Sequence, residues 1–222
     1  METFGMSIAL FDLDYTLIGF DSDHAWGEYL GLRGKVDAKE YSAKNDQFYA
    51  DYREGKLVMA DFLRFSLEPI GRLPLAELKA LRDDFMREQG LAQVLPKALE
   101  LVRLHKSRGD RTAIVTATNR FVTELFAEAF GVDHLMATEI LWKDGRPTGE
   151  PVGTPCFREG KIEHVQTWLN SFGGSLKDCS FYSDSRNDLA LLQAVGRPVA
   201  VDPDSTLLAA ARERGWTVLS LR

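Results

Sequence analysis

The sequence has few cysteines, no long apolar run and no concentration of positive charge. Its 222 residues include only two cysteines, Cys156 and Cys179, which are too few to staple a chain of this length and lack metal-ligand spacing. We expect both thiols to be reduced and to fill space in a core. The apolar stretch from Met6 to Phe11 is too short to cross a membrane and is followed at once by acidic residues, unlike a signal peptide or an anchor. We therefore expect a cytoplasmic protein with no membrane partner.

The charge is acidic and dispersed. The formal net charge is −6, and the lysines and arginines are scattered along the chain without forming a stripe. Such a chain does not attract a polyphosphate backbone, so we expect no nucleic-acid partner. Because 45% of the residues are hydrophobic, the chain can bury one good core and still leave room for an inserted subdomain.

Short apolar runs that end in hydroxyls or carboxylates recur along the chain. They predict buried parallel strands at Ser7–Phe11, Arg111–Thr116, Cys179–Asp184 and Pro198–Asp202. Helical patterns lie between or beside them at Ala98–Ser107, Arg120–Phe130, Ile162–Ser171 and Leu189–Val195. This alternation predicts an α/β fold with a doubly wound parallel sheet.

Residues 21–90 break the alternation. Helical patterns occur at His24–Leu32, Ala38–Arg53, Met59–Ser66 and Leu75–Gln89, with no strand-like run among them. We predict a helical cap over residues 21–90, inserted after the first strand, and a core made of residues 1–20 and 91–222. The segment Leu135–Glu150, with a turn at Lys143–Arg146, predicts a small hairpin beside the site.

Two carboxylates follow the first predicted strand. Asp12 and Asp14 lie two residues apart, where they repel each other unless a cation or a proton relieves them. Magnesium is the obvious cation, since it takes oxygen ligands and commonly combines one or two carboxylates with phosphate oxygens. The alternative is a solvated acidic turn.

A second acidic group follows the third predicted strand. Asp184 and Asp188 are four residues apart across a loop and a helix start, so both can face one metal ion. Because ligands gather outside the carboxyl ends of parallel strands, we expect Asp12, Thr116 and Asp184 to converge on one crevice. Helix capping is the alternative explanation of this second group, but it does not explain the carboxylates after the first strand.

Two further residues suit an anion. Thr116 ends the second predicted strand at what we expect to be a helix start, where its hydroxyl and nearby N–H groups can hold a phosphate. An N-cap role explains Thr116 nearly as well. Lys161 opens a predicted helix, a position where the macrodipole disfavours a cation and a site anion would compensate.

The order of these motifs resembles the haloacid dehalogenase superfamily of phosphatases across nearly the whole chain. The motifs are Asp-x-Asp-x-Thr from Asp12, then Thr116, then Lys161, then Ser-Asp-Ser-x-Asn-Asp from Ser183. The insert and the last motif look like the branch that contains phosphoserine phosphatase. The stretches Asp12–Trp26 and Gly153–Phe157 look most like the histidinol-phosphatase-like group. Tyr15 departs from the commonest superfamily pattern, which has glycine there.

The resemblance implies a catalytic scheme. Asp12 is the nucleophile that forms an aspartyl phosphate, and Asp14 is the general acid and base. The ligands of Mg²⁺ are Asp12, the backbone carbonyl of Asp14 and Asp184, while Asp188 either ligates the ion or orients a ligand. Thr116 and Lys161 bind phosphoryl oxygens, and Asn187 is a substrate contact.

The substrate expected from these features is a small phosphate ester, L-histidinol phosphate in preference to phosphoserine. Asp21 and Asp23 lie where the chain enters the cap, and they suit a cationic amino or imidazole group, although helix capping explains them equally well. A phosphotransferase or mutase, or a non-catalytic phosphate-sensing module, are the other functions compatible with the motifs. We expect a monomer or a weak homodimer.

Overall fold

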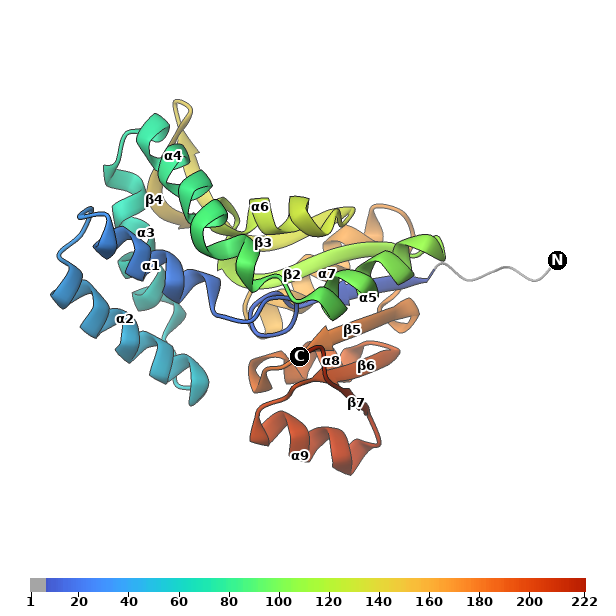
Figure 1. Cartoon of the computed structure of the whole chain (residues 1–222). Coiled ribbons are helices and arrows are strands. Elements are labelled where there is room, and N and C mark those ends of the chain that lie inside the picture. Colours follow the sequence, from blue (N-terminus) through green and yellow to red (C-terminus); the bar gives the residue numbers. More distant parts are fainter. Residues whose placement is uncertain (1–6) are drawn as a thin grey trace.

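A computed structural model of the chain describes residues 7–222, so residues 1–6 of the predicted core lie outside the described part. The strands are β1 (Ile8–Phe11), β2 (Arg111–Asn119), β3 (His134–Lys143), β4 (Arg146–Val152), β5 (Cys179–Ser183), β6 (Arg197–Val201) and β7 (Thr217–Leu219). The α-helices are α1 (Ser22–Leu32), α2 (Ala38–Arg53), α3 (Met59–Arg72), α4 (Leu75–Phe85), α5 (Pro96–Ser107), α6 (Arg120–Phe130), α7 (Glu159–Asn170), α8 (Leu189–Ala194) and α9 (Ser205–Arg214). Figure 1 shows their arrangement.

Within the described residues the strands form one sheet in the order β4-β3-β2-β1-β5-β6-β7. Neighbouring strands are parallel except for the antiparallel pair β3 and β4. The first strand is central, because β1 pairs with β2 on one side and with β5 on the other. The chain therefore reverses its direction of winding beside β1, and ligands of open α/β sheets gather at such a point. The predicted doubly wound sheet is confirmed.

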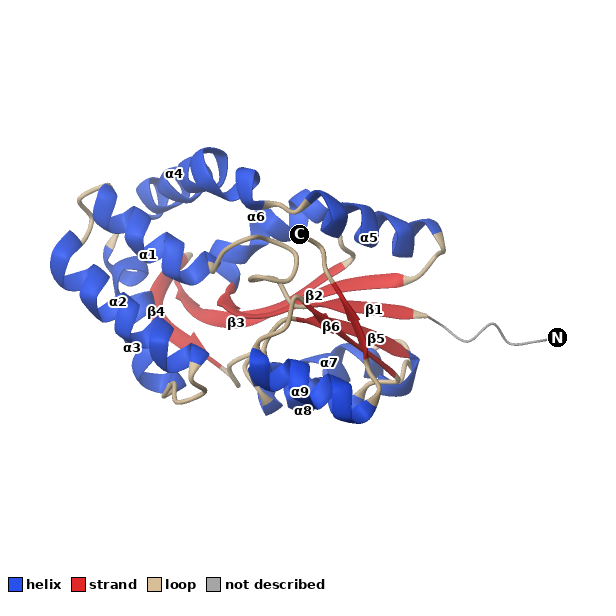
Figure 2. Ribbon diagram, turned by 60° about the horizontal axis from the view of Figure 1, so that its bottom comes forward, coloured by secondary structure: helices blue, strands red, loops and turns tan. Residues whose placement is uncertain are grey.

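Both faces of the sheet are covered, as the continuous apolar runs of its strands require. In β1, Ala9 and Phe11 face α5 and α6, whereas Ile8 and Leu10 face α7, α8 and α9. Figure 2 shows the two groups of helices on opposite sides of the sheet. Because helices cover both faces of the sheet, a site can form at the ends of its strands.

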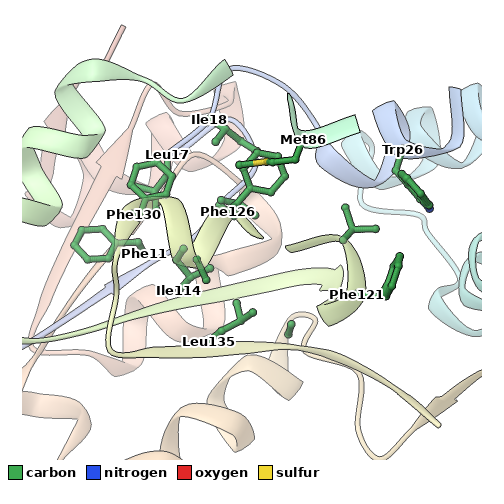
Figure 3. Close-up of a cluster of buried hydrophobic side chains, with 14 of the residues drawn as sticks. Phe11, Leu17, Ile18, Trp26, Met86, Ile114, Phe121, Phe126, Phe130 and Leu135 are labelled. Atoms are coloured by element: carbon green, nitrogen blue, oxygen red, sulfur yellow. The ribbon is translucent and has the colours of Figure 1, made fainter. Parts of the chain in front are cut away.

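The segment between β1 and β2 is helical, as predicted, and none of its residues from Ser22 to Gly90 belongs to a strand. Helix α3 continues past the predicted end at Ser66 to Arg72, and α4 ends at Phe85, where a π-helical turn (Met86–Gly90) follows. The core continues into these helices: Trp26 of α1 packs 6.2 Å from Phe121 of α6, ring centroid to ring centroid (Figure 3). The division into cap and core at residues 21 and 90 stays a prediction.

The hairpin of β3 and β4 has a larger role than the small hairpin that the sequence predicts. Strand β3 first pairs with β2 in parallel and then turns back into β4, so the hairpin extends the main sheet. Its second strand packs on α3, where a Cβ atom on Gly71 would lie 2.4 Å from the carbonyl oxygen of Thr148. Glycine permits this close approach of two backbones. The hairpin therefore supports one side of the helical insert.

Two smaller expectations can be compared with the structure. Cys156 and Cys179 are both free and buried, as expected of packing residues. Among residues 7–222, no helix combines the length and apolar character needed to cross a bilayer. Helix α9 and strand β7, at the end of the chain, have no counterpart in the sequence-based prediction.

Candidate active site

Asp12 lies directly after β1, at the C-terminal end of this central strand of the sheet. Its side chain is 5% exposed, and its backbone N–H donates to the carbonyl of Tyr182 at 2.9 Å, which continues the ladder by one residue beyond the strand. The chain then turns sharply, since the N–H of Leu17 donates to the carbonyl of Leu13 at 2.8 Å. This turn keeps the carboxylate of Asp12 at the end of the central strand.

Lys161 neutralises two carboxylates from opposite ends of the sequence. It lies in the first turn of α7 and is 2% exposed, and its Nζ atom donates to Asp12 Oδ1 at 2.8 Å and to Asp188 at 2.8 Å. Ser183 donates a further hydrogen bond of 2.7 Å to Asp188. Burial alone would lower the pKa of Lys161, but Asp12 and Asp188 raise the pKa well above its ordinary value. The lysine is therefore a cation at neutral pH, held against Asp12 and Asp188.

One hydroxyl group lies between the carboxylates of Asp184 and Asp12. Thr16 Oγ1 lies 3.2 Å from Asp12 Oδ2 and 3.3 Å from Asp184 Oδ1, and it accepts the N–H of Asp184 at 3.1 Å. A hydroxyl has a single proton, so it satisfies only one of these carboxylates at a time. Burial raises the pKa of Asp184 well above its ordinary value, and Asp12 and Asp188 add to the rise. Asp12 and Asp184 thus converge where too little positive charge is available to balance both carboxylates. Such a pair suits a divalent cation with oxygen ligands.

Asp14 is held on the other side of the same loop. Its Oδ1 accepts the N–H of Ser22 at 2.8 Å and its Oδ2 accepts the hydroxyl of Thr118 at 2.9 Å. Burial raises the pKa of Asp14 to about 7, and the neighbouring charge of Asp21 contributes. A carboxyl group with such a pKa exchanges protons near neutrality, which suits a general acid and base.

Asp21 and Asp23 flank the start of α1. Asp21 caps the helix by accepting the N–H of His24 at 2.8 Å, so the predicted capping role is present. Asp23 is 8% exposed, and its closest polar side-chain neighbour is the amide of Asn119 at 3.5 Å. Burial, followed by the charges of Asp21 and Asp14, raises the pKa of Asp23 well above its ordinary value. Within residues 7–222, no lysine or arginine forms an ion pair with either carboxylate.

Two cavities adjoin these residues. The inner pocket has a volume of about 40 Å³, and it is lined by Asp12, Asp14, Asp21, Asp23, His24, Asn45, Phe48, Tyr49, Tyr52, Leu57, Met59, Phe62, Thr116, Ala117 and Thr118. The outer cleft has a volume of about 760 Å³, and it is lined by Tyr15, Gly19, Tyr49, Ala50, Tyr52, Arg53, Glu54, Asp184, Ser185, Arg186, Asp202, Pro203, Asp204, Ser205, Thr206 and Arg222. The inner pocket thus joins the end of the sheet to the apolar and aromatic face of the helical insert.

The structure changes the predicted position of Thr116 and gives the surroundings of Asn187. Strand β2 continues through Thr116 to Asn119, and α6 begins only at Arg120, so the expectation that Thr116 stands at a helix start is wrong. Thr116 nevertheless lines the inner pocket and accepts the N–H of Thr118 at 3.2 Å. The amide of Asn187 donates to the carbonyl of Tyr52 at 3.1 Å, which ties the end of α2 to the core, and Asn187 is not among the residues that line the inner pocket.

Three side chains of the site have no role in the sequence analysis. Thr16 links Asp12 to Asp184, Thr118 donates to Asp14, and Arg158 donates to the carbonyl of Gly55 at 2.6 Å at the end of α2. Thr16 belongs to the quoted Asp-x-Asp-x-Thr motif, and Thr118 follows Thr116 by two residues. Both are hydroxyl residues near strand ends, which is the signal that could have identified them. No local signal marks Arg158.

A second group of possible metal ligands lies away from Asp12. His24, Glu28 and Asp46 approach one another between α1 and α2. His24 Nε2 is 2.8 Å from Asp46 Oδ1, and Glu28 accepts hydrogen bonds from Ser42 and Asn45. These side chains already bond to each other or to neighbours, so the group joins two helices of the insert.

Residues 9–193 match the family described as haloacid dehalogenase-like hydrolase. The chain belongs to this family, and it is a hydrolase of the phosphatase type. A histidinol-phosphatase of Neisseria meningitidis serogroup C (strain 8013) is 42% identical over 220 residues, which cover 97% of this chain and 99% of that protein. A phosphoserine phosphatase of Mycobacterium tuberculosis (strain ATCC 25618 / H37Rv) is 31% identical over 217 residues, which cover 96% of this chain and 70% of that protein.

Solved structures share the fold. A protein of unknown function from Bordetella pertussis Tohama I superposes with a TM-score of 0.92 at 42% identity, covering 98% of this chain and 100% of that one. A substrate-bound phosphoserine phosphatase superposes with a TM-score of 0.72 at 19% identity, covering 98% of this chain and 93% of that one. At that identity the second likeness concerns the fold alone.

Proposed function

We propose that the chain is a Mg²⁺-dependent phosphomonoesterase that hydrolyses L-histidinol phosphate through a phosphoryl group carried on Asp12. The observation that carries the choice of substrate is the charge of the inner pocket. Four aspartates line it, and no lysine or arginine of the described chain does. Such a pocket favours a leaving group that carries positive charge and no carboxylate.

The first step is attack by Asp12 on phosphorus. A carboxylate oxygen of Asp12 forms a bond to phosphorus while the bond from phosphorus to the ester oxygen breaks, and the leaving alkoxide takes a proton from Asp14. In the second step Asp14 accepts a proton from a water molecule, whose oxygen attacks the same phosphorus and returns Asp12 to a carboxylate. The pKa of Asp14, about 7, allows one group to serve in both directions.

The remaining core residues balance charge during transfer. Lys161 lies 2.8 Å from Asp12 and offsets part of its negative charge when a phosphate dianion approaches. Thr116 lines the inner pocket, which supports a role for its hydroxyl in binding a phosphoryl oxygen. These groups are buried before substrate arrives, so little reorganisation accompanies the reaction.

The donor set fits Mg²⁺. Asp12 and Asp184 would hold the ion together with the backbone carbonyl of Asp14, because both carboxylates converge on the single hydroxyl of Thr16. Asp188 is already bonded to Lys161 and Ser183, which favours the orienting role over direct ligation. When bound, Mg²⁺ supplies charge neutralisation to the transferring phosphoryl group.

The inner pocket distinguishes the two candidate substrates. L-histidinol phosphate has an amine and an imidazole and no carboxylate, whereas phosphoserine has a carboxylate that would meet Asp21 and Asp23 without a neighbouring cation. Asp23 is buried and has no cationic partner in residues 7–222, so an ammonium or imidazolium group of the substrate would relieve its desolvation. The name of the Neisseria relative, a histidinol-phosphatase, supports the same choice.

The test is phosphate release from L-histidinol phosphate, phosphoserine and sugar phosphates, with Mg²⁺ or with a chelator. We expect Mg²⁺-dependent release, with kcat/KM for L-histidinol phosphate at least about tenfold above the other esters. Asp12→Asn should lower kcat by about 10⁴-fold or more. Asp37→Asn, at the exposed N-cap of α2, is the matched control and should retain wild-type rates.

Other outcomes separate the alternatives. Preference for phosphoserine would refute the substrate but keep the chemistry, and transfer of label into an added alcohol would indicate a phosphotransferase. Tight binding of an ester without turnover, unaltered in Asp12→Asn, would indicate a sensing module.

A further inference from the structure

A pair of hydrogen-bonded tyrosines from distant parts of the chain lies beside both the inner pocket and the outer cleft. Tyr15 follows Asp14 in the loop after β1, Tyr49 lies in α2, and their hydroxyl oxygens are 2.7 Å apart. Tyr49 and Tyr52 line both cavities, while Tyr15 lines the outer cleft. The bonded pair therefore adjoins both a pocket of about 40 Å³ and a cleft of about 760 Å³.

The backbone of Tyr15 is strained. Its φ angle is 56°, in the left-handed region that favours glycine, so a bulky aromatic side chain is held there against local preference. Such outliers persist only where the surrounding structure enforces them, and they concentrate at functional sites. The position next to Asp14 places this strain within the loop that carries the nucleophile.

Both rings are braced by neighbours. The guanidinium of Arg222 lies 5.9 Å from the centroid of the Tyr15 ring and donates to the Tyr15 carbonyl at 3.3 Å. Lys97 in turn donates to the carbonyl of Arg222 at 2.5 Å. On the other side, the His24 ring lies 5.0 Å from the ring of Tyr49. Burial, followed by the hydrogen bond with Tyr49, raises the pKa of Tyr15, so its hydroxyl stays protonated and able to bond at neutral pH.

We propose that Tyr15 and Tyr49 form a wall that limits the length of the leaving group, and that this pair determines specificity for small esters. The inference rests on the proposed phosphatase function. When phosphorus is at Asp12, the leaving group extends past Asp14 into the inner pocket, and the bonded tyrosines close that pocket toward the wide cleft. Without the wall, a longer group could continue into the outer cleft.

The structure offers a substitution that removes the wall and spares the backbone. Tyr15→Gly deletes the ring at a position where φ is positive, which glycine adopts without strain. Tyr15→Phe and Tyr49→Phe delete only the hydrogen bond and keep both rings. Tyr41→Phe is the matched control, since Tyr41 lies in α2, stacks on Phe65 at 4.2 Å and lines neither cavity.

The measurement compares two aryl esters that differ in length, phenyl phosphate and 4-biphenylyl phosphate. In Tyr15→Gly we expect the kcat/KM of the biphenylyl ester relative to that of the phenyl ester to rise by about tenfold or more. The two Phe variants should show a smaller rise, and Tyr41→Phe should match the wild type. If the ratio of the two kcat/KM values is unchanged in Tyr15→Gly, the proposal that the two tyrosines form a wall is refuted.

Measurements of binding test the proposed wall independently of catalysis. Calorimetric titration of both esters into Asp12→Asn, with and without Tyr15→Gly, reports the length limit even when no ester is hydrolysed. Tighter binding of the biphenylyl ester after Tyr15→Gly supports the wall, whatever the activity. If the wild type hydrolyses esters but Tyr15→Gly changes neither the ratio of the two kcat/KM values nor the ratio of the two affinities, only the proposed wall is refuted. If no ester is hydrolysed or bound, the wall and the proposed function are both refuted.

Discussion

On the core side of the site, Asp12 and Asp188 each lie 2.8 Å from Lys161, whereas on the cap side Asp21 and Asp23 have no lysine or arginine partner in residues 7–222. Asp12, Asp188 and Asp23 are all buried, so the difference between them does not come from solvent. Burial of an unpaired carboxylate costs free energy and raises its pKa, as it does for Asp23. Under the proposed function, the protein supplies its own cation beside Asp12, and the substrate supplies the cation of the inner pocket.

The largest expected effect comes from removing the core cation. Lys161→Met leaves Asp12 and Asp188 buried without their shared partner, which should reduce the free energy of unfolding by about 3–5 kcal/mol. Loss of an electrostatic contact near the transferring group should lower kcat by about 10²–10³-fold. Urea denaturation and steady-state kinetics measure the two effects.

Lys177→Met is the control for this change. Lys177 is exposed and donates to the carbonyl of Ala194, so its loss should alter stability by less than about 0.5 kcal/mol. If Lys161→Met were as mild as Lys177→Met, the two sides of the site would not differ in the way described.

A smaller and more selective effect is expected on the cap side. Asp23→Asn keeps the shape of the side chain and removes a buried carboxyl group that is costly to ionise, so stability should hold or increase. The kcat/KM for L-histidinol phosphate should fall by about 10–100-fold, because a bond to a charged group is lost. For phenyl phosphate, which has no amine, the kcat/KM should change by less than about twofold.

Asp37→Asn is the matched control. It makes the same substitution at the N-cap of α2, outside the inner pocket. Equal losses on both esters in Asp23→Asn would assign that residue a structural role and remove the main support for a cationic leaving group.

The smallest effect expected is on the pH dependence of stability. A carboxyl group whose folded-state pKa is raised holds a proton that the unfolded chain has already released, so the free energy of unfolding falls as pH rises. For Asp14 this interval extends from its ordinary pKa of 3.8 to about 7. Without Mg²⁺ or substrate, the urea midpoint should therefore decrease as the pH rises from about 4 to about 7.

Asp14→Asn should flatten that decrease, whereas Asp37→Asn should not. A midpoint of Asp14→Asn that falls as steeply as the wild type would show that Asp14 does not carry the shift. A wild-type midpoint that rises over the same interval would contradict the raised pKa values of the cap-side carboxylates.

The local pattern of the sequence was enough to identify the central strands and the carboxylates after them. Apolar runs that end in polar residues reflect burial on both faces of a parallel sheet, and that pattern is written into each strand separately. Asp12 and Asp184 follow β1 and β5 as predicted, and the strand order brings them to one edge. The local pattern misjudged the end of β2, because residues 117–119 continue the strand where a helix start was expected.

What only the tertiary structure decided is which of these side chains meet. Thr118 donates to Asp14 across 104 positions of sequence, Lys161 bonds to Asp12 across 149, and Tyr15 bonds to Tyr49 between the nucleophile loop and the insert. No periodicity encodes such contacts, because they depend on how strands and helices pack in three dimensions. The sequence by itself therefore determined the central strands and the carboxylates that follow them, whereas packing determined how those carboxylates are neutralised and which side chains line the inner pocket.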